Sequence, residues 1–260
     1  MRRTDARAIV QRTAVVTGVG AERGIGRAVA DRFAADGWAV AGLDLDGVSA
    51  KELTTELAER YGVPTFGGVV DVADEASVLA ARDAVVAAGL PPVGAVLNIA
   101  GIASTESFLD TTLELWNRVF AVNSTGPDLV TKAFLPEMIA GGFGRIVNMS
   151  SVSAQQGGGV FSKTPYSAAK AAVLGFTRSL ARELGPAGIT VNAVAPGAVD
   201  TDIRLGGTSD EAEAAITRSI PLGRQASVED IAALCAFLAS EDAAYITGCT
   251  HNINGGAYIA

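Results

Sequence analysis

Residues 13–26 read TAVVTGVGAERGIG, and this stretch decides how the fold is predicted. It opens on a short apolar, β-branched run that is typical of a buried strand. A helical pattern follows in residues 24–37, with Ile25, Val29 and Phe33 on one face. A strand, a glycine-rich turn and a helix in this order predict a site where backbone N–H groups and a helix N-terminus hold a phosphate.

The glycines of the turn are spaced unusually. Five residues separate Gly18 from Gly24, more than the dinucleotide pattern G-x-G-x-x-G allows, whereas Gly24 and Gly26 keep its ending. The interval also brings Glu22 and Arg23 into the turn. A flexible loop is the alternative interpretation, because tight strand-to-helix turns require glycine in any case.

The rest of the chain repeats this alternation of apolar runs and helical patterns. Strands are predicted at residues 13–18, 38–44, 65–71, 94–101, 144–151 and 189–196, and helices at residues 26–37, 50–62, 75–89, 113–123 and 165–185. The alternation predicts an α/β fold of the Rossmann type, a doubly wound parallel sheet with helices on both faces. No linker or internal repeat divides the chain, so a single domain is expected over residues 1–260.

Three segments lie outside these elements. Residues 1–12 are expected to form an N-terminal extension without the apolar region of a signal peptide. Residues 155–164 contain three consecutive glycines, and residues 202–219 are polar with a short helical pattern. Long segments beyond strand ends are often functional, so residues 202–219 are expected to form a substrate lid, with a plain surface loop as the alternative.

The composition narrows the class of partner. The chain has 20 basic and 28 acidic residues and a net charge of -8, which argues against nucleic acids and anionic membranes. Its only cysteines, Cys235 and Cys249, lack metal-ligand spacing and are expected to be buried free thiols in a reducing cytosol. No run approaches the ~18 apolar residues of a membrane span, so a soluble, cytoplasmic protein is expected.

The second predicted strand ends at Asp44, 20 residues after Gly24. An acidic residue at that spacing accepts hydrogen bonds from the adenosine ribose hydroxyls of NAD and disfavours the 2'-phosphate of NADP. Asp46 could instead be only the cap of the following helix. Arg23 is able to attract a 2'-phosphate, although Glu22 beside it offsets that charge. We therefore expect NAD as the cofactor, with NADP as the alternative.

Tyr166 and Lys170 lie four residues apart in YSAAK, at the start of a predicted helix with Pro165 in its first turn and Thr164 as a candidate N-cap. This spacing puts both side chains on one helix face. A phenol has a pKa of ~10, and a neighbouring ammonium favours its phenolate. The pair is a candidate proton donor and acceptor for an alcohol or carbonyl, although this spacing alone usually marks a solvated helix face.

From residue 13 to residue 256 the sequence resembles the short-chain dehydrogenase/reductase family. The motifs that carry the resemblance are TGVGAERGIG, Asp44, Asp71-Val72, NIAG at residues 98–101, Asn123 in VNSTG, SSVS at residues 150–153, YSAAK and PGAVDT at residues 196–201. The resemblance implies hydride transfer between a nicotinamide cofactor and a secondary alcohol or ketone, with no metal.

The resemblance also implies a role for each matching residue. Tyr166 would be the catalytic acid/base, and Lys170 would lower its pKa and hold the nicotinamide ribose. Ser151 would bind the substrate oxygen, and Asn123 would hold a water in the proton relay unless it only bonds backbone locally. The residues implied to bind the cofactor are Gly18, Arg23, Gly24, Ile25, Gly26, Asp44, Leu45, Asp71, Val72, Asn98, Ala100, Gly101, Tyr166, Lys170, Pro196, Gly197, Val199 and Thr201.

Two spacings depart from the family pattern. The turn has two more residues than the usual TGxxxGxG, so the amides that face the phosphates are uncertain. Ser151 precedes Tyr166 by 15 residues, whereas Ser153 has the common family spacing of 13. Ser151 is the preferred catalytic serine because it directly follows a predicted strand, and the glycines at residues 157–159 absorb the added length.

The two irregular segments do not specify a substrate. Because the chain resembles 3-oxoacyl-acyl-carrier-protein reductases, NADPH-dependent reduction of 3-oxoacyl groups on a carrier protein or CoA is the alternative function. The turns AGGFG and GPAGI lack basic residues, which disfavours an acidic carrier protein. A non-catalytic nucleotide-binding protein on the same fold is a lesser alternative, which the intact set of catalytic residues disfavours. The resemblance also implies a homotetramer.

Overall fold

The computed structural model describes residues 11–159, 162–201 and 209–259. Over these ranges seven parallel strands form one sheet in the order β3-β2-β1-β4-β5-β6-β7. The strands are β1 (Thr13–Thr17), β2 (Ala39–Asp44), β3 (Thr65–Val69), β4 (Val93–Asn98), β5 (Gly144–Met149), β6 (Ile189–Pro196) and β7 (Thr250–Ile253). The chain runs outward from β1 to β3 and then returns to β4 on the other side of β1. The Rossmann-type fold is confirmed, and β1 and β4 flank its topological switch point.

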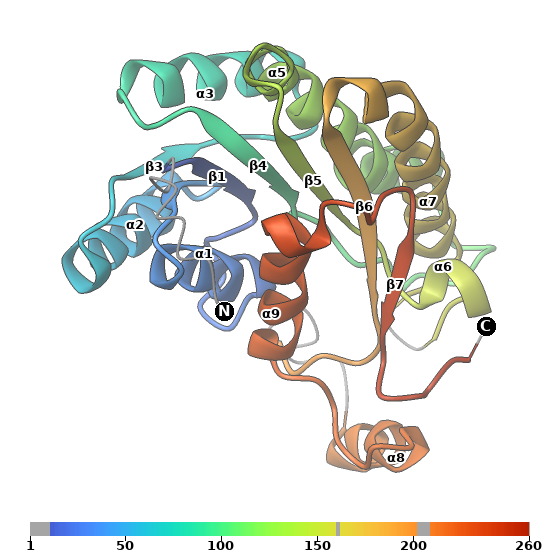
Figure 1. The fold of residues 1–260 in the computed structure, drawn as a ribbon. Coiled ribbons are helices and arrows are strands. Elements are labelled where there is room, and N and C mark those ends of the chain that lie inside the picture. The colour runs from blue at the N-terminus through green and yellow to red at the C-terminus, as the bar shows by residue number, and fades with distance from the viewer. Residues whose placement is uncertain (1–10, 160–161, 202–208, 260) are drawn as a thin grey trace.

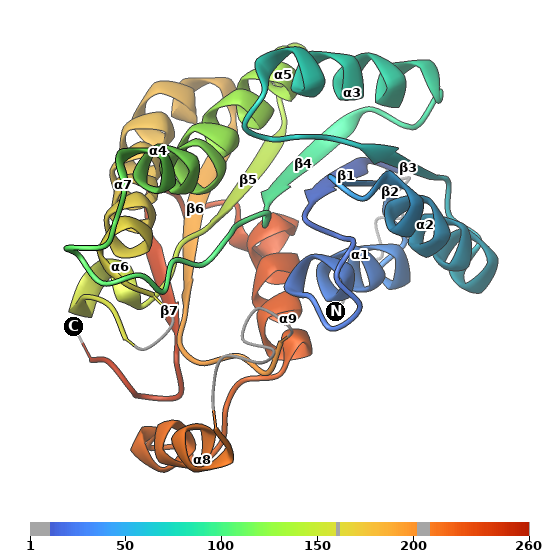
Figure 2. The same ribbon diagram turned by 180° about the vertical axis from the view of Figure 1, so that it is seen from behind.

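Helices cover both faces of this sheet (Figure 1). One face carries α1 (Ile25–Ala35), α2 (Gly47–Tyr61) and α9 (Val228–Ala239), and the opposite face carries α3 (Glu75–Ala87), α5 (Gly126–Gly141) and α7 (Thr164–Leu184). The view from behind shows the same two layers (Figure 2). Three further helices are α4 (Leu113–Phe120), α6 (Ser153–Gln156) and α8 (Asp210–Ser219). In both views α8 stands apart from the two layers.

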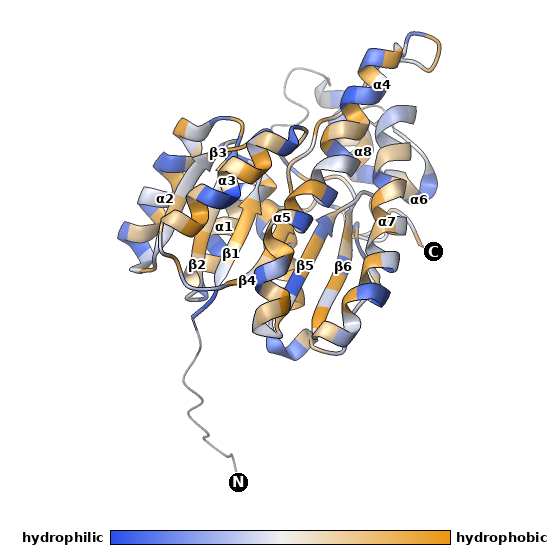
Figure 3. Cartoon of the chain, turned by 90° about the horizontal axis from the view of Figure 1, so that it is seen from above, coloured by the Kyte–Doolittle hydropathy of each residue, from blue (hydrophilic) through white to orange (hydrophobic). Residues whose placement is uncertain are grey.

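The core has two halves, one on each face of the sheet. Successive side chains of a strand point to opposite faces, so Ala14 and Val16 pack with Phe33 on one side while Val15 packs with Phe134 on the other. The strands are coloured mainly as hydrophobic in Figure 3, as expected for strands that are covered twice. This rigid sheet fixes the positions of the loops at its carboxyl edge.

The elements that were not predicted from the sequence include β7, α5 and α9, besides the short helix α6. β7 is only four residues long and reads THNI, without an apolar run. α5 contains Pro136 in its interior, which interrupts a helical pattern. α9 is mostly apolar, and its clearest signal is a capping box between Ser227 and Asp230.

Two smaller predictions are wrong. The N-cap of α7 is Lys163 and not Thr164, because the Lys163 N–H donates to Ser104 O (2.9 Å) and the backbone becomes helical at the next residue. Cys249 is exposed, since it lies in the turn before β7, whereas Cys235 is buried in α9 as expected.

Candidate active site

Two cavities adjoin at the carboxyl edge of the sheet. The first has a volume of about 610 Å³ and lies between the glycine turn and the ends of β2 and β4. The second, about 400 Å³, lies among the ends of β5 and β6 and the start of α7. Ile25, Ile99, Gly101 and Thr201 line both. The two cavities therefore form one continuous cleft beside the switch point, where ligands of such sheets bind.

The glycine turn forms one wall of the first cavity and is closely packed. Gly18 has a left-handed φ of 77°. A Cβ on Gly26 would lie 2.1 Å from Gly18 O, so a side chain at Gly26 is sterically forbidden. Gly24 is the N-cap of α1, whose first turn has no acidic residue. The first N–H groups of α1 thus border the cavity, as an anion site requires.

Asp44 anchors the enlarged part of this turn. Its Oδ2 accepts from Gly20 N (2.8 Å) and its Oδ1 accepts from Asp46 N (2.9 Å). A carboxylate offers about four acceptor positions, so about two remain for groups in the cavity that Asp44 lines. Asp46 is the N-cap of α2, since its side chain accepts from Val48 N and Ser49 N.

Arg23 does not line either cavity. Its guanidinium forms an ion pair with Asp200 at 2.5 Å, and both side chains are largely exposed. Asp200 directly precedes Thr201, so the pair links the added residues of the turn to the segment after β6. Glu22 also lies outside the cleft and lines a separate surface groove with Arg27 and Asp31. Both inserted charges therefore lie outside the cleft, and only Arg23 is shown to contact the segment after β6.

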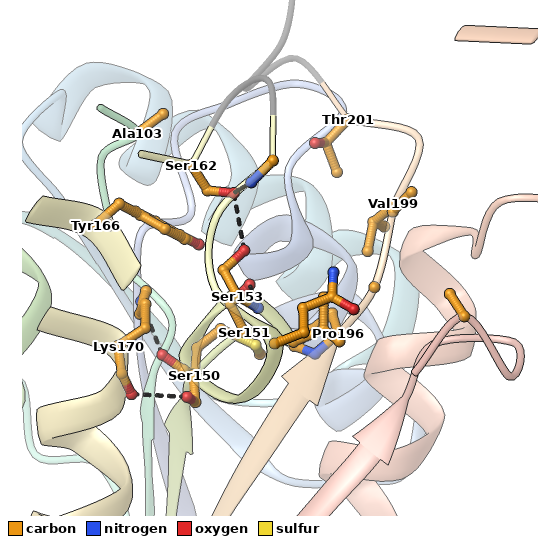
Figure 4. A pocket seen from close by; sticks show the side chains of 18 of the residues that line it. Ala103, Ser150, Ser151, Ser153, Ser162, Tyr166, Lys170, Pro196, Val199 and Thr201 are labelled. Atoms are coloured by element: carbon orange, nitrogen blue, oxygen red, sulfur yellow. Dashed lines mark hydrogen bonds between the residues drawn. The ribbon is translucent and has the colours of Figure 1, made fainter. Parts of the chain in front are cut away.

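Tyr166 and Lys170 extend from the first turns of α7 into the second cavity (Figure 4). Ser151 lines the same cavity, and its hydroxyl is close enough to the Tyr166 oxygen to lower the pKa of the phenol. Lys170 is only 3% exposed, and its Nζ donates to Met149 O at 2.7 Å. The same Nζ lies 5.7 Å from the centre of the Tyr166 ring. Hydroxyl, phenol and ammonium groups thus converge on one side of the cavity.

Burial dominates the titration of this pair. It raises the pKa of Tyr166 above its ordinary value, and the nearby Ser151 hydroxyl opposes that shift. Burial also lowers the pKa of Lys170 to about 8. We expected the ammonium to lower the pKa of Tyr166. In this structure burial outweighs the lowering effect of Ser151, and Lys170 Nζ donates to a backbone carbonyl. At neutral pH the phenol is protonated and the ammonium is largely retained.

The two candidate serines have different partners. Ser151 lines the cavity and faces Tyr166, whereas the Ser153 Oγ is bonded to the Ser162 Oγ at 2.8 Å. The Ser153 N–H donates to the Ser151 Oγ (3.2 Å), which leaves the Ser151 O–H available as a donor. The short helix α6 and the glycines after it take up the longer interval, which supports the preference for Ser151.

Asn123 lies in a π-helical turn, Ala121–Thr125, between α4 and α5. Its Nδ2 donates to Ile102 O (2.9 Å) and Val119 O (3.0 Å), and its Oδ1 accepts from Ile102 N (3.2 Å). The side chain is fully buried, and the Cβ of an alanine at Gly101 would lie 2.7 Å from Oδ1 and 3.4 Å from Lys170 Nζ. Asn123 therefore packs directly behind the cleft and fixes the loop after β4. π turns of this kind often occur at functional sites.

Asn98 also lies behind the cleft and does not line it. Its Nδ2 donates to Thr131 Oγ1 (2.9 Å) and Asn148 Oδ1 (2.8 Å), and Asn148 Nδ2 donates to Thr177 Oγ1 (3.0 Å). This buried network joins β4 and β5 to helices α5 and α7. Asn98 thus positions the strand ends and does not reach the space where we expected it to bind a cofactor.

All the other site residues predicted from the sequence line one of the two cavities. The sequence analysis did not single out Ala103, Ser162, Ile216, Ile220 and Ala257, which line the second cavity. These residues come from three separate loops and the end of α8, and they carry no shared motif. The one usable signal was the pair of isoleucines, which lie four residues apart at the end of α8.

Metal ligands and membrane spans were also sought among the described residues. In these ranges no group of three or more His, Cys, Asp or Glu side chains is placed to hold a metal ion. Among the described helices, none is both long and apolar enough to cross a membrane.

Comparisons with known proteins identify the family of the chain. A family model described as enoyl-(acyl carrier protein) reductase matches residues 18–258. The uncharacterized short-chain type dehydrogenase/reductase y4mP of Sinorhizobium fredii is 43% identical, over 95% of this chain and 98% of its own. The 3-oxoacyl-(acyl-carrier-protein) reductase FabG of Aquifex aeolicus is 40% identical, over 92% of this chain and 95% of its own. The (3R)-3-hydroxyacyl-CoA dehydrogenase of Mus musculus is 39% identical, over 95% of this chain and 96% of its own. The chain therefore belongs to the short-chain dehydrogenase/reductase family and is a nicotinamide-dependent oxidoreductase.

Proposed function

We propose that this enzyme transfers a hydride between NAD and a secondary alcohol or ketone, with Tyr166 as the acid/base. The observation that carries the proposal is the convergence of Ser151, Tyr166 and Lys170 in the second cavity, which adjoins the first. The first cavity suits a dinucleotide, because a helix N-terminus, a glycine turn and the free acceptor positions of Asp44 line it. A nicotinamide bound at the junction supplies the hydride in reduction and accepts it in oxidation.

The residues of the chain bind the substrate oxygen and move the proton. The Ser151 and Tyr166 hydroxyls both donate to a carbonyl oxygen placed between them, which polarises the carbonyl. In reduction Tyr166 then gives its proton to that oxygen, and the charge of Lys170 stabilises the phenolate left behind. In oxidation the phenolate accepts the alcohol proton. Asn123 holds the loop behind Gly101 in place, and we expect it to order a water beside Lys170.

The cofactor preference tests the role of Asp44. We expect Asp44→Asn to lower the preference for NADH over NADPH at least about tenfold in kcat/KM, because the negative charge that repels a 2'-phosphate is removed. Asparagine keeps the shape and one acceptor for Gly20 N or Asp46 N. Asp44→Ala should also lower the preference for NADH over NADPH. It should weaken the binding of both cofactors as well, since the turn loses the bonds from Gly20 N and Asp46 N. The measurement is the rate with each cofactor at a fixed substrate concentration.

The matched control is Asp46→Asn. It removes the same charge two residues away and keeps a residue that caps helices well, outside the cavity. Its NADH to NADPH ratio should stay within about twofold of the wild type. A wild-type enzyme that already favours NADPH would contradict the assignment of NAD.

Reduction of a 3-oxoacyl thioester with NADPH is the second candidate function. It is supported by the names of the relatives from Aquifex aeolicus and Mus musculus, which act on acyl groups carried by a protein or by CoA. A panel of secondary alcohols assayed for NADH formation, beside 3-oxoacyl thioesters assayed for NADPH consumption, separates the two candidates. Turnover of the thioesters with NADPH alone would replace the first candidate by the second.

We also propose a soluble, cytoplasmic homotetramer. Exposed apolar side chains support association, notably Phe108, Leu109 and Leu113, which are close in the chain and 68%, 93% and 74% exposed. Light scattering on the purified protein gives the number of subunits.

A further inference from the structure

A pair of serine hydroxyls lies on the wall of the second cavity, beyond the catalytic groups. Ser153 is 5% exposed and begins α6, whereas Ser162 comes from the segment before α7. Their Oγ atoms are 2.8 Å apart and both residues line the cavity. In Figure 4 the hydroxyl end of Tyr166 points toward the side of the pocket where this pair lies. The proposed mechanism does not use either hydroxyl.

Counting hydrogens shows that the pair has a donor to spare. Two hydroxyls carry two hydrogens, and the bond between the Oγ atoms uses one of them. The Ser162 Oγ also accepts from Gly159 N (3.3 Å), so this contact consumes an acceptor and not a hydrogen. Among the described residues no acceptor is recorded for the second hydrogen. The second hydrogen is therefore open to an acceptor on a molecule in the cavity that both serines line.

The pair is held in place from behind. Ser162 forms a parallel bridge with Ser104, and the adjacent Lys163 N–H donates to Ser104 O (2.9 Å). A Cβ on Gly158 would lie 1.8 Å from Ser162 O, so the loop passes Ser162 at the closest approach that glycine permits. These contacts hold the Ser162 backbone beside the cavity, and the bond between the two Oγ atoms orients the hydroxyls.

The position of the pair sets what it can recognise. The Ser153 N–H donates to the Ser151 Oγ at 3.2 Å, so the pair lies next to the serine that binds the reacting oxygen. Other parts of the same cavity are lined by apolar side chains, including Val152, Val199, Ile216 and Ile220. A spare donor beside the reaction centre in a mainly apolar pocket favours a ligand with an oxygen acceptor close to its carbonyl.

We propose that the Ser153–Ser162 pair is a specificity device that selects ketones carrying a second acceptor oxygen near the reacting carbonyl. The proposal rests on the proposed function, because it assigns Ser151 and Tyr166 to the reacting oxygen. The pair itself takes no part in the proton transfer.

The test compares two ketones of equal chain length. Ethyl 3-oxobutanoate has a second carbonyl, and heptan-2-one has the same number of chain atoms without it. Ser153→Ala and Ser162→Ala should each lower kcat/KM for the keto ester about three- to tenfold, mainly through KM, because one neutral hydrogen bond remote from the chemistry is lost. The rate with heptan-2-one should change less than about twofold. The double variant should resemble either single variant, since the hydroxyls act as one unit.

Two further variants separate recognition from structure. Ser162→Thr keeps the hydroxyl and should retain the preference for the keto ester. Ser167→Ala removes a hydroxyl from the same region, one that donates to Ser162 O and lies outside the cavity, and should leave the ratio of the two substrates unchanged. Melting temperatures check that all variants are folded.

An equal loss with both ketones, or no loss with either, overturns the role of the pair and leaves the proposed function standing. The absence of hydride transfer from NADH or NADPH to either ketone in the wild type overturns the proposed function on this class of substrate, and the selection with it. A lower kcat/KM for the keto ester alone, restored by Ser162→Thr, is the result that supports the proposal.

Discussion

Tyr166→Phe will lower kcat for ketone reduction about a thousandfold or more, and will leave cofactor binding nearly unchanged. General acid catalysis by a positioned side chain contributes roughly 10² to 10⁴ in rate, and Tyr166 is the proton donor in the mechanism that we propose. Phenylalanine keeps the ring and removes only the oxygen. The measurements are steady-state kinetics with the ketone and titration of the protein with NADH.

Tyr245→Phe is the control for this change. It removes the same hydroxyl from a fully exposed tyrosine outside both cavities, so its kinetics should match the wild type. Turnover by Tyr166→Phe at a rate near the wild type would show that another group donates the proton. An equal loss of NADH binding would show that the change damages the fold of the cleft.

Lys170→Met will lower kcat/KM for reduction about a hundredfold, because the phenolate that forms on Tyr166 loses its neighbouring charge. The pH profile gives the sharper test. Burial lowers the pKa of Lys170 to about 8, so the wild type should lose reductase activity as the pH rises through about 8 and the ammonium is deprotonated. The variant lacks the ammonium, so its residual activity should not decline as the pH rises through about 8.

Lys163→Met is the matched control. Lys163 is the N-cap of the same helix and does not line the catalytic cavity. We expect its kcat/KM and its pH profile to follow the wild type. If the activity of Lys170→Met still declined near pH 8, the titration would belong to another group.

Lys170→Met should also make the folded protein more stable. The lowered pKa of Lys170 means that the folded state disfavours the ammonium, so its protonation costs stability below pH 8 and this cost fades as the pH rises from about 8 toward the ordinary lysine pKa. Methionine removes the charge but also the bond to Met149 O. The free energy of unfolding at pH 7 should therefore rise by about 2 kcal/mol. Denaturant unfolding would contradict this account if it showed a lower value.

The sequence predicted the parts of the fold that depend on local patterns. The glycine turn, six strands, the helix after the turn and the YSAAK helix are visible in apolar periodicity and in glycine and proline positions. β7 was not predicted, because this short polar strand forms by pairing with β6. α5 was not predicted, because Pro136 lies inside it. Tertiary context overrides the local signal in both cases.

Some residues of the site could likewise be predicted from local patterns, and others could not. Asp44 and Tyr166 could be predicted because fixed spacings tie them to a strand end and a helix start. The Ser153–Ser162 pair could not be predicted, since its members meet across a loop whose path no local pattern determines. The Arg23–Asp200 ion pair is likewise a long-range contact. The pKa of Tyr166 depends on burial, which spacing alone does not give.

The most direct test of the central claim follows the hydride itself. The wild type is incubated with ethyl 3-oxobutanoate and with NADH that carries deuterium at the transferable position of the nicotinamide, and the product is examined by NMR and mass spectrometry. We predict one deuterium on the carbinol carbon of the product alcohol and none on its hydroxyl. An alcohol without deuterium at that carbon, or label at any other carbon, would contradict it.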